Sequence, residues 1–427
     1  MTFLDTMAAI SRRVTRRRVL VMTDQGASSL SNIVVAILVA RSFDAPEPFG
    51  AFSLAMIAYQ LSLGVVRSVV GEALLSLYST ESASVRRGQV ADLVGATLST
   101  SLLGSAVLWA LSIPLGGLSG AALAGLAVVL PLVLLQDTWR FVFVIDRPGA
   151  TLALDLVWLG AVVVALGFAP HAAGVTWYVV VWGLTGGLGA ILGFVLNGGP
   201  YTGLHPWRWL VQHRSVTSRF LGETFTARAL FQLQMSGLGA IAGLDALGAV
   251  RAAQLFYGPL NTLNAGVYLA VVPEGAVVRD QPQRLRRKLV VICLGLATVG
   301  AAWMLVGLVF PTSWGRALFG TTWQAADDLM FPMGLVTIFA ALMLGGLLGL
   351  RSLADAKRSL RARLKATPWL AVCPLAGAAL SGALGFTIGA AMGTAIAAAI
   401  WWSTFESALE DVDGTASLGL TQPQRAL

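Results

Sequence analysis

Charged residues are scarce in this sequence, at 12% of 427 residues, whereas about 25% is usual for a soluble domain. Hydrophobic residues make up 56% of the chain, and the mean hydropathy is +0.76. One helical crossing of a bilayer needs about 20 predominantly apolar residues. Such stretches follow one another almost without a break from Val19 to Trp402. The composition therefore excludes an ordinary soluble protein and predicts an all-α, polytopic membrane protein.

Cysteine and histidine are also rare, with two and three residues respectively. Cys293 and Cys373 fall in apolar stretches, which indicates neither a disulfide framework nor a metal cluster. The three histidines lie in predicted loops without ligand spacing: His171, His205 and His213. No loop is long enough to form an aqueous domain with clustered carboxylates. We therefore expect no metal site, no cofactor and no enzyme activity.

The apolar stretches predict twelve membrane spans. Their approximate ranges are 19–41, 49–74, 90–113, 119–136, 151–169, 175–196, 217–241, 247–273, 288–310, 328–350, 367–384 and 387–403. The last two ranges are separate spans only if the glycine-rich stretch 382–389 contains a tight turn.

The basic residues predict the orientation, because lysine and arginine are retained in cytoplasmic loops. With both termini in the cytoplasm, only Arg41 and Arg316 lie in outer loops, while Arg67, Arg228 and Arg251 fall within spans. The remaining basic residues then lie next to anionic lipid headgroups. The net charge of +8 thus indicates contact with membrane lipids and not with nucleic acid. We expect an inner (plasma) membrane protein.

The first span carries the polar stretch "MTDQGASSLSN". Asp24, Gln25, Asn32 and three serines share an arc of about 160° on a helical wheel. An unpartnered polar group in hydrocarbon costs several kcal/mol, so this face must meet other helices or water. The serines are equally consistent with simple contacts between helices. An ionisable residue within a span is a functional candidate, which singles out Asp24.

Three further spans carry polar stripes. In the eighth span, an arc of about 140° holds the residues Arg251, Gln254, Tyr257, Asn261 and Asn264. Gly258-Pro259 interrupts this span, either at a substrate site or as a packing kink. The seventh span adds Glu223 and Arg228, and the second adds Gln60 and Arg67. We expect spans one, two, seven and eight to share one hydrated cavity.

Spans seven and eight repeat spans one and two after six helices, which predicts a parallel repeat. The expected lobes are 19–196 and 217–403, joined by a cytoplasmic connection at 197–216 and flanked by cytoplasmic segments 1–18 and 404–427. Trp207 and Trp209 in the connection are expected at the membrane interface.

The motifs "DQGASSLSN", "VARSF…FGAFSLA", "LLQDTWRF", "LGAVRAAQLFYGPLN" and "VVPEG" resemble the polysaccharide or O-antigen flippases of the multidrug/oligosaccharidyl-lipid/polysaccharide (MOP) exporter superfamily. The resemblance implies a V-shaped architecture of two six-helix lobes, like that of the multidrug-extrusion (MATE) transporters. It also implies a central cavity with alternating access, which moves a polyprenyl-diphosphate-linked oligosaccharide to the outer leaflet for polysaccharide biosynthesis. Lipid II flippases of this superfamily typically carry fourteen helices, so the predicted twelve disfavour that branch.

A lipid diphosphate is anionic and its sugars are rich in hydroxyls, so its cavity needs cations and neutral hydrogen-bonding groups. Arginine suits phosphate through two-point hydrogen bonds, which makes Arg67, Arg228 and Arg251 candidate contacts. The candidate glycan or water partners are Gln25, Asn32, Gln60, Gln254, Asn261 and Asn264. The alternative is internal ion pairing, of Arg67 with Glu72 or of Arg228 with Glu223.

Asp24 and Glu223 are the candidates for H+ or Na+ coupling, because a low-dielectric cavity raises the proton affinity of a carboxylate; they are otherwise gating or capping residues. Asp137 and Arg140 lie three residues apart and form either a gate for the inward state or a surface salt bridge of little energy. Asp155 is expected to open the fifth span, where its charge favours a helix N-terminus.

Three other functions remain open from the sequence. A membrane-embedded glycosyltransferase or ligase acting on the same lipids is disfavoured, because the loops lack clusters of carboxylates or metal ligands. A drug or metabolite antiporter of the same superfamily favours an acidic and aromatic cavity, whereas three of the charges within spans are arginines. A non-transporting scaffold leaves the polar stripes unexplained. The basic segment "GLLGLRSLADAKRSLRARLK" is a candidate contact for a polysaccharide polymerase or glycosyltransferase. We expect a monomer.

Overall fold

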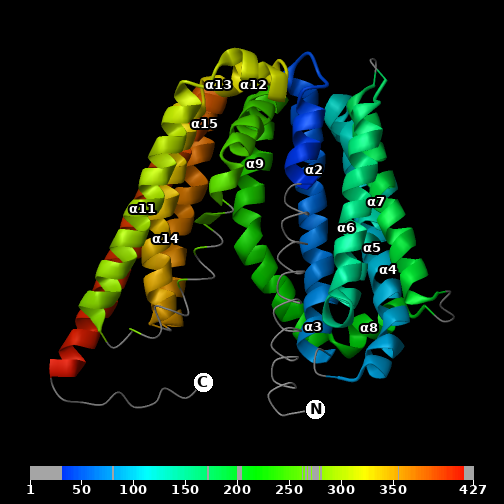
Figure 1. Cartoon of the computed structure of the whole chain (residues 1–427), viewed down its shortest axis with the longest axis horizontal. Helices are drawn as coiled ribbons and strands as arrows, with labels where there is room; N and C mark the ends of the chain where they lie inside the picture. The colour runs from blue at the N-terminus through cyan, green and yellow to red at the C-terminus, as the bar shows by residue number, and fades with distance from the viewer. Residues whose placement is uncertain are drawn as a thin grey trace, which may run out of the picture. The chain divides into compact units, whose positions relative to one another are not determined.

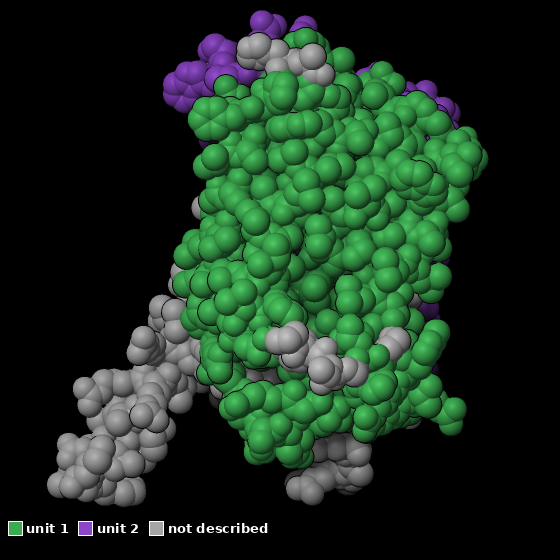
Figure 2. All heavy atoms as spheres, turned by 90° about the vertical axis from the view of Figure 1, so that its right-hand side faces the viewer, with its two compact units in different colours: residues 1–232 green, residues 233–427 purple. Residues whose placement is uncertain are grey.

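The computed structural model describes residues 31–78, 81–170, 173–199, 204–261, 281–353 and 355–417, together with residues 263, 264, 267, 271 and 278. These residues form helices joined by short turns, and none of them lies in a β-strand (Figure 1). The chain divides into two compact units, Met1–Gln232 and Leu233–Leu427, which have different colours in Figure 2. The division falls within a helix, C-terminal to the predicted connection at 197–216.

The first unit contains, in chain order, a short apolar helix Ser31–Ala40, α2 (Pro46–Val66), η1 (Arg67–Gly71), α3 (Glu72–Tyr78), α4 (Ala83–Leu115), α5 (Gly117–Asp146), α6 (Pro148–Gly167), α7 (Val175–Asn197), α8 (Pro206–Gln212) and the start of α9 (Arg214–Phe256). The second unit contains the rest of α9, α11 (Pro282–Leu308), α12 (Thr312–Phe319), α13 (Thr322–Asp327), α14 (Met330–Ser352) and α15 (Ala356–Ser417). Proline begins four of these helices, because its fixed φ and missing N–H suit the first turn.

Nine helices in the described ranges are long and apolar enough to cross a membrane, as expected of a multi-pass membrane protein. The sequence predicts twelve spans, and the difference has two causes. The first predicted span is described only from residue 31 onward. In addition, α9 and α15 each contain a break in helical geometry.

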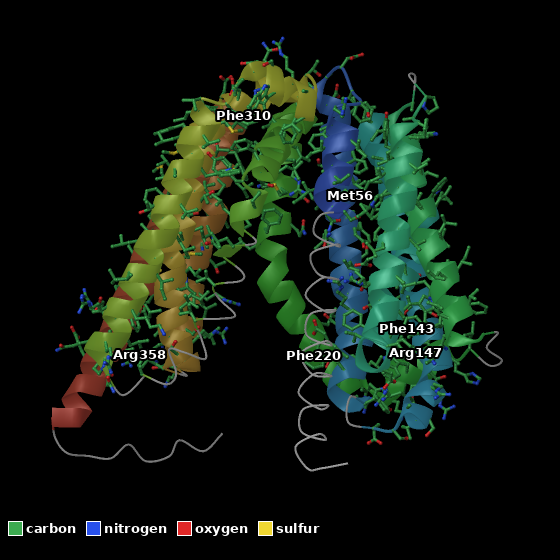
Figure 3. All side chains as sticks on the ribbon, in the orientation of Figure 1. Met56, Phe143, Arg147, Phe220, Phe310 and Arg358 are labelled. Atoms are coloured by element: carbon green, nitrogen blue, oxygen red, sulfur yellow. The ribbon has the colours of Figure 1, made fainter. Side chains whose placement is uncertain are left out.

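The helix α15 doubles back on itself. Ser381 and Gly382 leave helical geometry, and Gly382 has φ 56° and ψ −132°, a conformation that favours glycine. A Cβ atom on Gly389 would overlap the carbonyl oxygen of Cys373, so the arms before and after the break touch through their backbones. Arg358, near the start of α15 (Figure 3), contacts Asp411 near the end of the same helix. The predicted spans 367–384 and 387–403 are thus the arms of a hairpin, with its turn at 381–382.

The helix α9 has a similar break at Gly243, where φ is 87° and ψ is 171°. Gln254 Nε2 donates to Met235 Sδ over 3.6 Å, which joins the segments on either side of the break. These segments correspond to the predicted spans 217–241 and 247–273. The helix α9 ends at Phe256, Tyr257 is a turn residue, and a further helical stretch begins at Gly258, so the helix is interrupted one residue before the Gly258-Pro259 pair.

Between α2 and α3 the chain forms a π-helical turn, η1, which nothing in the sequence pattern predicts. Such turns are rare and often mark functional sites. The turn lies very close to α5: a Cβ atom on Gly71 would be 2.7 Å from the ring of Phe141. A residue without a side chain is therefore needed here, and Arg67 is the first residue of the turn.

The predicted connection at 197–216 includes the short helix α8. Trp209 on this helix is fully buried, and its Nε1 donates to the carbonyl oxygen of Val69 over 2.8 Å. The side chain of Trp209 therefore packs inside the protein, where the indole finds its hydrogen-bond acceptor in η1, and its position at the membrane interface stays a prediction. Trp207, two residues earlier, is exposed.

Candidate functional site

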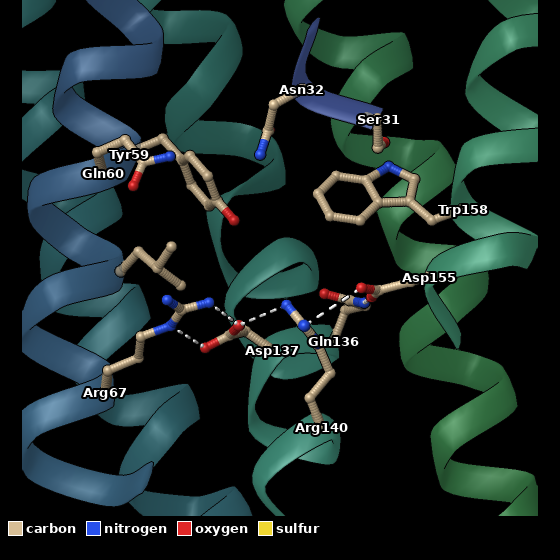
Figure 4. A pocket seen from close by; sticks show the side chains of 11 residues that line it. Ser31, Asn32, Tyr59, Gln60, Arg67, Gln136, Asp137, Arg140, Asp155 and Trp158 are labelled. Carbon is tan, nitrogen blue, oxygen red and sulfur yellow. Dashed lines mark hydrogen bonds and ion pairs between the residues drawn. The ribbon is translucent and has the colours of Figure 1, made fainter. Parts of the chain in front are cut away.

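A polar cavity of about 180 Å³ lies within the first unit (Figure 4). The helix Ser31–Ala40, α2, η1, α5 and α6 contribute to its wall. Its lining residues are Ser31, Asn32, Tyr59, Gln60, Leu63, Arg67, Gln136, Asp137, Arg140, Asp155 and Trp158. Four of the predicted spans, the first, second, fourth and fifth, thus meet at one polar site.

Arg67 and Asp137 form a two-point ion pair at this site. Arg67 Nε donates to Asp137 Oδ2 over 2.9 Å, and Nη2 donates to Oδ1 over 2.6 Å. The side chain of Asp137 is 4% exposed, whereas that of Arg67 is 27% exposed. The carboxylate is therefore buried, while part of the guanidinium stays accessible. The pair joins α5 to η1.

Arg140 extends this pair into a row of alternating charges. Its Nη1 lies 3.7 Å from Asp137 Oδ1, and its Nη2 lies 3.3 Å from Asp155 Oδ2. Gln136 Nε2 donates to Asp155 Oδ1 over 3.1 Å. Arg140 and Asp155 are 11% and 3% exposed. Alternating the signs offsets part of the desolvation cost that each buried charge carries.

Helical spacing explains how these side chains reach one cavity. Gln136, Asp137 and Arg140 follow one another on α5 at intervals that place them on one helix face. Asp155 and Trp158 lie three residues apart on α6, and Gln60 precedes Arg67 by two turns of α2. Each helix contributes a polar stripe to the cavity, while its other side chains pack or face lipid.

Two aromatic rings fix the uncharged part of the wall. Tyr59 packs edge-on against Trp182, with ring centroids 4.8 Å apart. Trp158 Nε1 donates to the carbonyl oxygen of Trp182 over 3.3 Å. In the view of Figure 4, Tyr59, Gln60 and Asn32 lie above the row of charged groups. The cavity is thus lined by amide groups, a phenol and charged side chains.

The structure brings together five of the residues singled out from the sequence: Asn32, Gln60, Arg67, Asp137 and Arg140. Sequence reasoning missed the lining roles of Tyr59, Gln136, Asp155 and Trp158. The spacing in "LLQDTWRF" indicated a shared face for Asp137 and Arg140, and the same spacing includes Gln136. No pattern in the sequence linked α6 to that face.

Three expectations about pairing need correction. The acid that pairs with Arg67 is Asp137 and not Glu72, because η1 lies against α5. Asp137 and Arg140 do not form a surface salt bridge, since both side chains are buried. Asp155 does not open its helix, because α6 begins at Pro148 and the carboxylate instead meets Arg140.

The other candidate residues lie elsewhere or outside the described residues. In the second unit, Arg251 Nη1 donates to Gln254 Oε1 over 3.0 Å. Asn261 is exposed and Asn264 is partly buried. Four candidates have no described side chain: Asp24, Gln25, Glu223 and Arg228. A cavity shared by the predicted spans one, two, seven and eight stays a prediction.

A second hydrogen-bonded group supports η1 from outside the cavity. His213 Nδ1 lies 3.1 Å from the Trp209 carbonyl oxygen, so this nitrogen must carry the proton, and His213 Nε2 lies 3.0 Å from the Tyr78 hydroxyl. Burial, then Glu81 and Asp92, raises the pKa of Tyr78, which keeps its hydroxyl protonated as a donor. Tyr78 ends α3, so these bonds hold α8 against the segment that follows Arg67.

No protein-family model and no curated sequence matches this chain. Solved structures do match it over nearly its whole length. It is similar to an inward-facing multidrug resistance MATE transporter of the MOP superfamily, with a TM-score of 0.66 and 13% identity, covering 91% of this chain and 96% of that one. It is also similar to the lipid II flippase MurJ in an inward closed conformation, with a TM-score of 0.67 and 11% identity over 95% and 94%.

A third match is a MOP superfamily transporter from Pyrococcus furiosus, with a TM-score of 0.54 and 13% identity, covering 94% of this chain and 96% of that one. The structural neighbours are therefore MOP superfamily transporters. Similarity at these identities shows the fold alone, so the function has to be argued from the site.

Proposed function

We propose that this protein is a transporter that flips a polyprenyl-diphosphate-linked oligosaccharide from the cytoplasmic to the outer leaflet by alternating access, in the synthesis of a cell-surface polysaccharide. The observation that carries the proposal is the partly exposed Arg67 guanidinium in a polar cavity among membrane-spanning helices. Ionisable residues within spans are costly and commonly mark the path of a substrate.

The groups around Arg67 suit both parts of such a cargo. Arg67 Nη1 has no hydrogen-bond partner among the described residues, so it can donate to a phosphate oxygen. Gln60 and Asn32 line the same cavity, and their amides offer both donors and acceptors to sugar hydroxyls. A scaffold protein has no need for such a set of groups.

The remaining candidate residues take the following roles in this proposal. Arg228 and Arg251 are further cationic contacts, with Gln25, Gln254, Asn261 and Asn264 as polar partners of the glycan. Asp24 and Glu223 are the groups for H+ or Na+ coupling, and Glu72 is a gating residue. A polymerase or glycosyltransferase that supplies or consumes the glycan is the expected partner.

The second candidate is a cation-coupled multidrug or metabolite antiporter. The observation that favours it is the burial of two carboxylates, Asp137 and Asp155, beside the aromatic rings of Tyr59 and Trp158. Such a wall also suits an organic cation. Both carboxylates, however, already contact arginines, which leaves the cavity without an excess of negative charge among its described residues.

Reconstitution in liposomes tests the proposal. The probe is a fluorescent polyprenyl-diphosphate oligosaccharide, and the readout is its protein-dependent movement between leaflets. We expect R67Q to reduce the rate by about tenfold or more, since a charge-assisted hydrogen bond contributes about 1.5–3 kcal/mol. R316Q, on the exposed part of α12, is the matched control and should retain the wild-type rate.

Movement of the lipid that is absent in the wild type, or unchanged in R67Q, contradicts the proposal. Uptake of an organic cation driven by an ion gradient, together with no lipid movement, would establish the antiporter instead.

A further inference from the structure

The carboxylate of Asp137 occupies one of the two sides of the Arg67 guanidinium on which a phosphate could bind through two hydrogen bonds. Arginine recognises phosphate through two parallel N–H···O bonds. Asp137 already takes such a pair, from Nε and Nη2 at 2.9 and 2.6 Å. While it stays there, an anion can reach Arg67 only at the other end of the guanidinium, through Nη1 and the second N–H of Nη2. The negative charge of Asp137 would also repel that anion at short range.

Arg140 offers Asp137 a second place to bind. Its Nη1 lies 3.7 Å from Asp137 Oδ1, the same oxygen that accepts from Arg67 at 2.6 Å. The carboxylate therefore stands between two guanidinium groups and is much closer to one of them. A small rotation of the side chain would exchange the close partner without leaving a buried charge unpaired, which would otherwise be costly.

The two arginines differ in accessibility. Arg67 is 27% exposed and Arg140 is 11% exposed. An entering ligand thus meets Arg67 more readily, whereas Arg140 lies deeper and already contacts Asp155. The geometry favours a ligand on Arg67 and the displaced carboxylate on Arg140, and not the reverse.

We propose that Asp137 is an internal competitor of the substrate, which holds the Arg67 guanidinium in the empty protein and moves onto Arg140 when an anionic headgroup binds. This inference rests on the proposed function and adds a specificity-determining residue to it. Only a ligand with at least two suitably spaced anionic oxygens replaces both hydrogen bonds of the carboxylate. Neutral lipids leave the Arg67–Asp137 pair intact, and the site discriminates against them.

The test measures binding of farnesyl diphosphate, a soluble prenyl diphosphate, to the purified full-length protein by calorimetry. D137N removes the competitor, and we expect it to tighten binding by on the order of tenfold. D155N is the charge-matched control, because it removes one negative charge from the same cavity but no hydrogen bond to Arg67. The gain in D137N should clearly exceed the gain in D155N.

The R67Q background separates displacement from a general change in charge. If Asp137 competes for Arg67, the gain from D137N disappears in the R67Q/D137N double variant, because the two residues act as one unit. Should D137N fail to fold, D137E replaces it. That variant keeps the charge, its longer side chain disturbs the two-point geometry, and tighter binding is again expected.

The outcomes distinguish this inference from the proposed function. If the wild type moves the lipid oligosaccharide but D137N binds farnesyl diphosphate no more tightly than D155N, displacement is refuted and the proposed function stands. If neither the wild type nor D137N binds the diphosphate and no lipid moves, both are refuted. If the protein is an antiporter for organic cations, D137N should instead weaken the binding of the cation, because it removes a negative charge that attracts it.

Discussion

Arg67 was identifiable from the sequence as a charged residue within a span, because composition and periodicity locate such residues directly. Its partner was not. Asp137 lies 70 residues away, and the pair forms because η1 brings the chain against α5. Helical periodicity predicts which side chains share a face of one helix, as it did for Asp137 and Arg140. It contains no information about which faces of different helices meet, and so Asp155 was assigned to a helix end.

Gly71 sets the distance between η1 and α5. The variant G71A adds a methyl group that would lie 2.7 Å from the Phe141 ring, so the ring or the turn must move. We expect a loss of stability of about 1–3 kcal/mol, seen as a lower melting temperature of the purified protein. G160A is the control, because nothing lies within 4 Å of a Cβ atom at Gly160 on α6; equal melting temperatures for the two variants would contradict this account.

At the scale of elements, the helices follow closely from the apolar runs, and their turns do so less closely. The sequence predicts a tight turn somewhere within 382–389, and the structure has the turn at 381–382, at the start of that stretch. Glycine is frequent throughout this stretch, both where a positive φ requires it and where two backbones touch. Gly382 serves the first purpose and Gly389 the second, and composition alone does not separate them.

The backbone contact within α15 leads to a prediction about Gly389. A methyl group there would overlap the carbonyl oxygen of Cys373, which is a backbone atom and cannot rotate away. We expect G389A to cost about 3 kcal/mol or more and to reduce the amount of folded protein recovered from membranes. G295A on α11, where a Cβ atom meets nothing within 4 Å, should leave that amount unchanged.

The indole of Trp209 is the clearest link between α8 and η1. W209F removes the hydrogen bond to the Val69 carbonyl oxygen while keeping most of the buried ring. A buried hydrogen bond contributes about 0.5–1.5 kcal/mol to stability, so the melting temperature should fall. Lipid transport should fall too if η1 must hold Arg67 in place. W207F changes an exposed tryptophan, and a fall of the same size in that variant would rule out the specific role of the bond.

At the scale of the whole molecule, the sparse charge and the apolar runs were enough to predict an all-helical membrane protein. The MATE-like fold was implied only by the resemblance of the motifs, and the structural neighbours confirm that fold. The expected sharing of one cavity by both halves is a different kind of statement. It depends on how two units meet, whereas the cavity described above is formed within the first unit by its own helices.

The predicted orientation can be tested with single cysteines in a C293A/C373A background. Arg316 is expected outside and Arg284 inside, because basic residues are retained in the cytoplasm. In intact cells, a membrane-impermeant maleimide should label R316C, while R284C should react only after permeabilisation. Both positions are exposed in the structure, so burial does not limit either reaction. The reverse pattern would place both termini on the outer side.

The described charges that line the cavity cancel, with Arg67 and Arg140 balanced by Asp137 and Asp155. A bound ligand with two negative charges therefore makes the occupied site anionic unless a counter-ion enters with it. Carrying that excess through the bilayer moves it along the electric field, at about 2.3 kcal/mol per charge for each 100 mV. Because the cytoplasm is electrically negative, the membrane potential would favour outward movement of such a ligand and would supply part of the driving force for its transport.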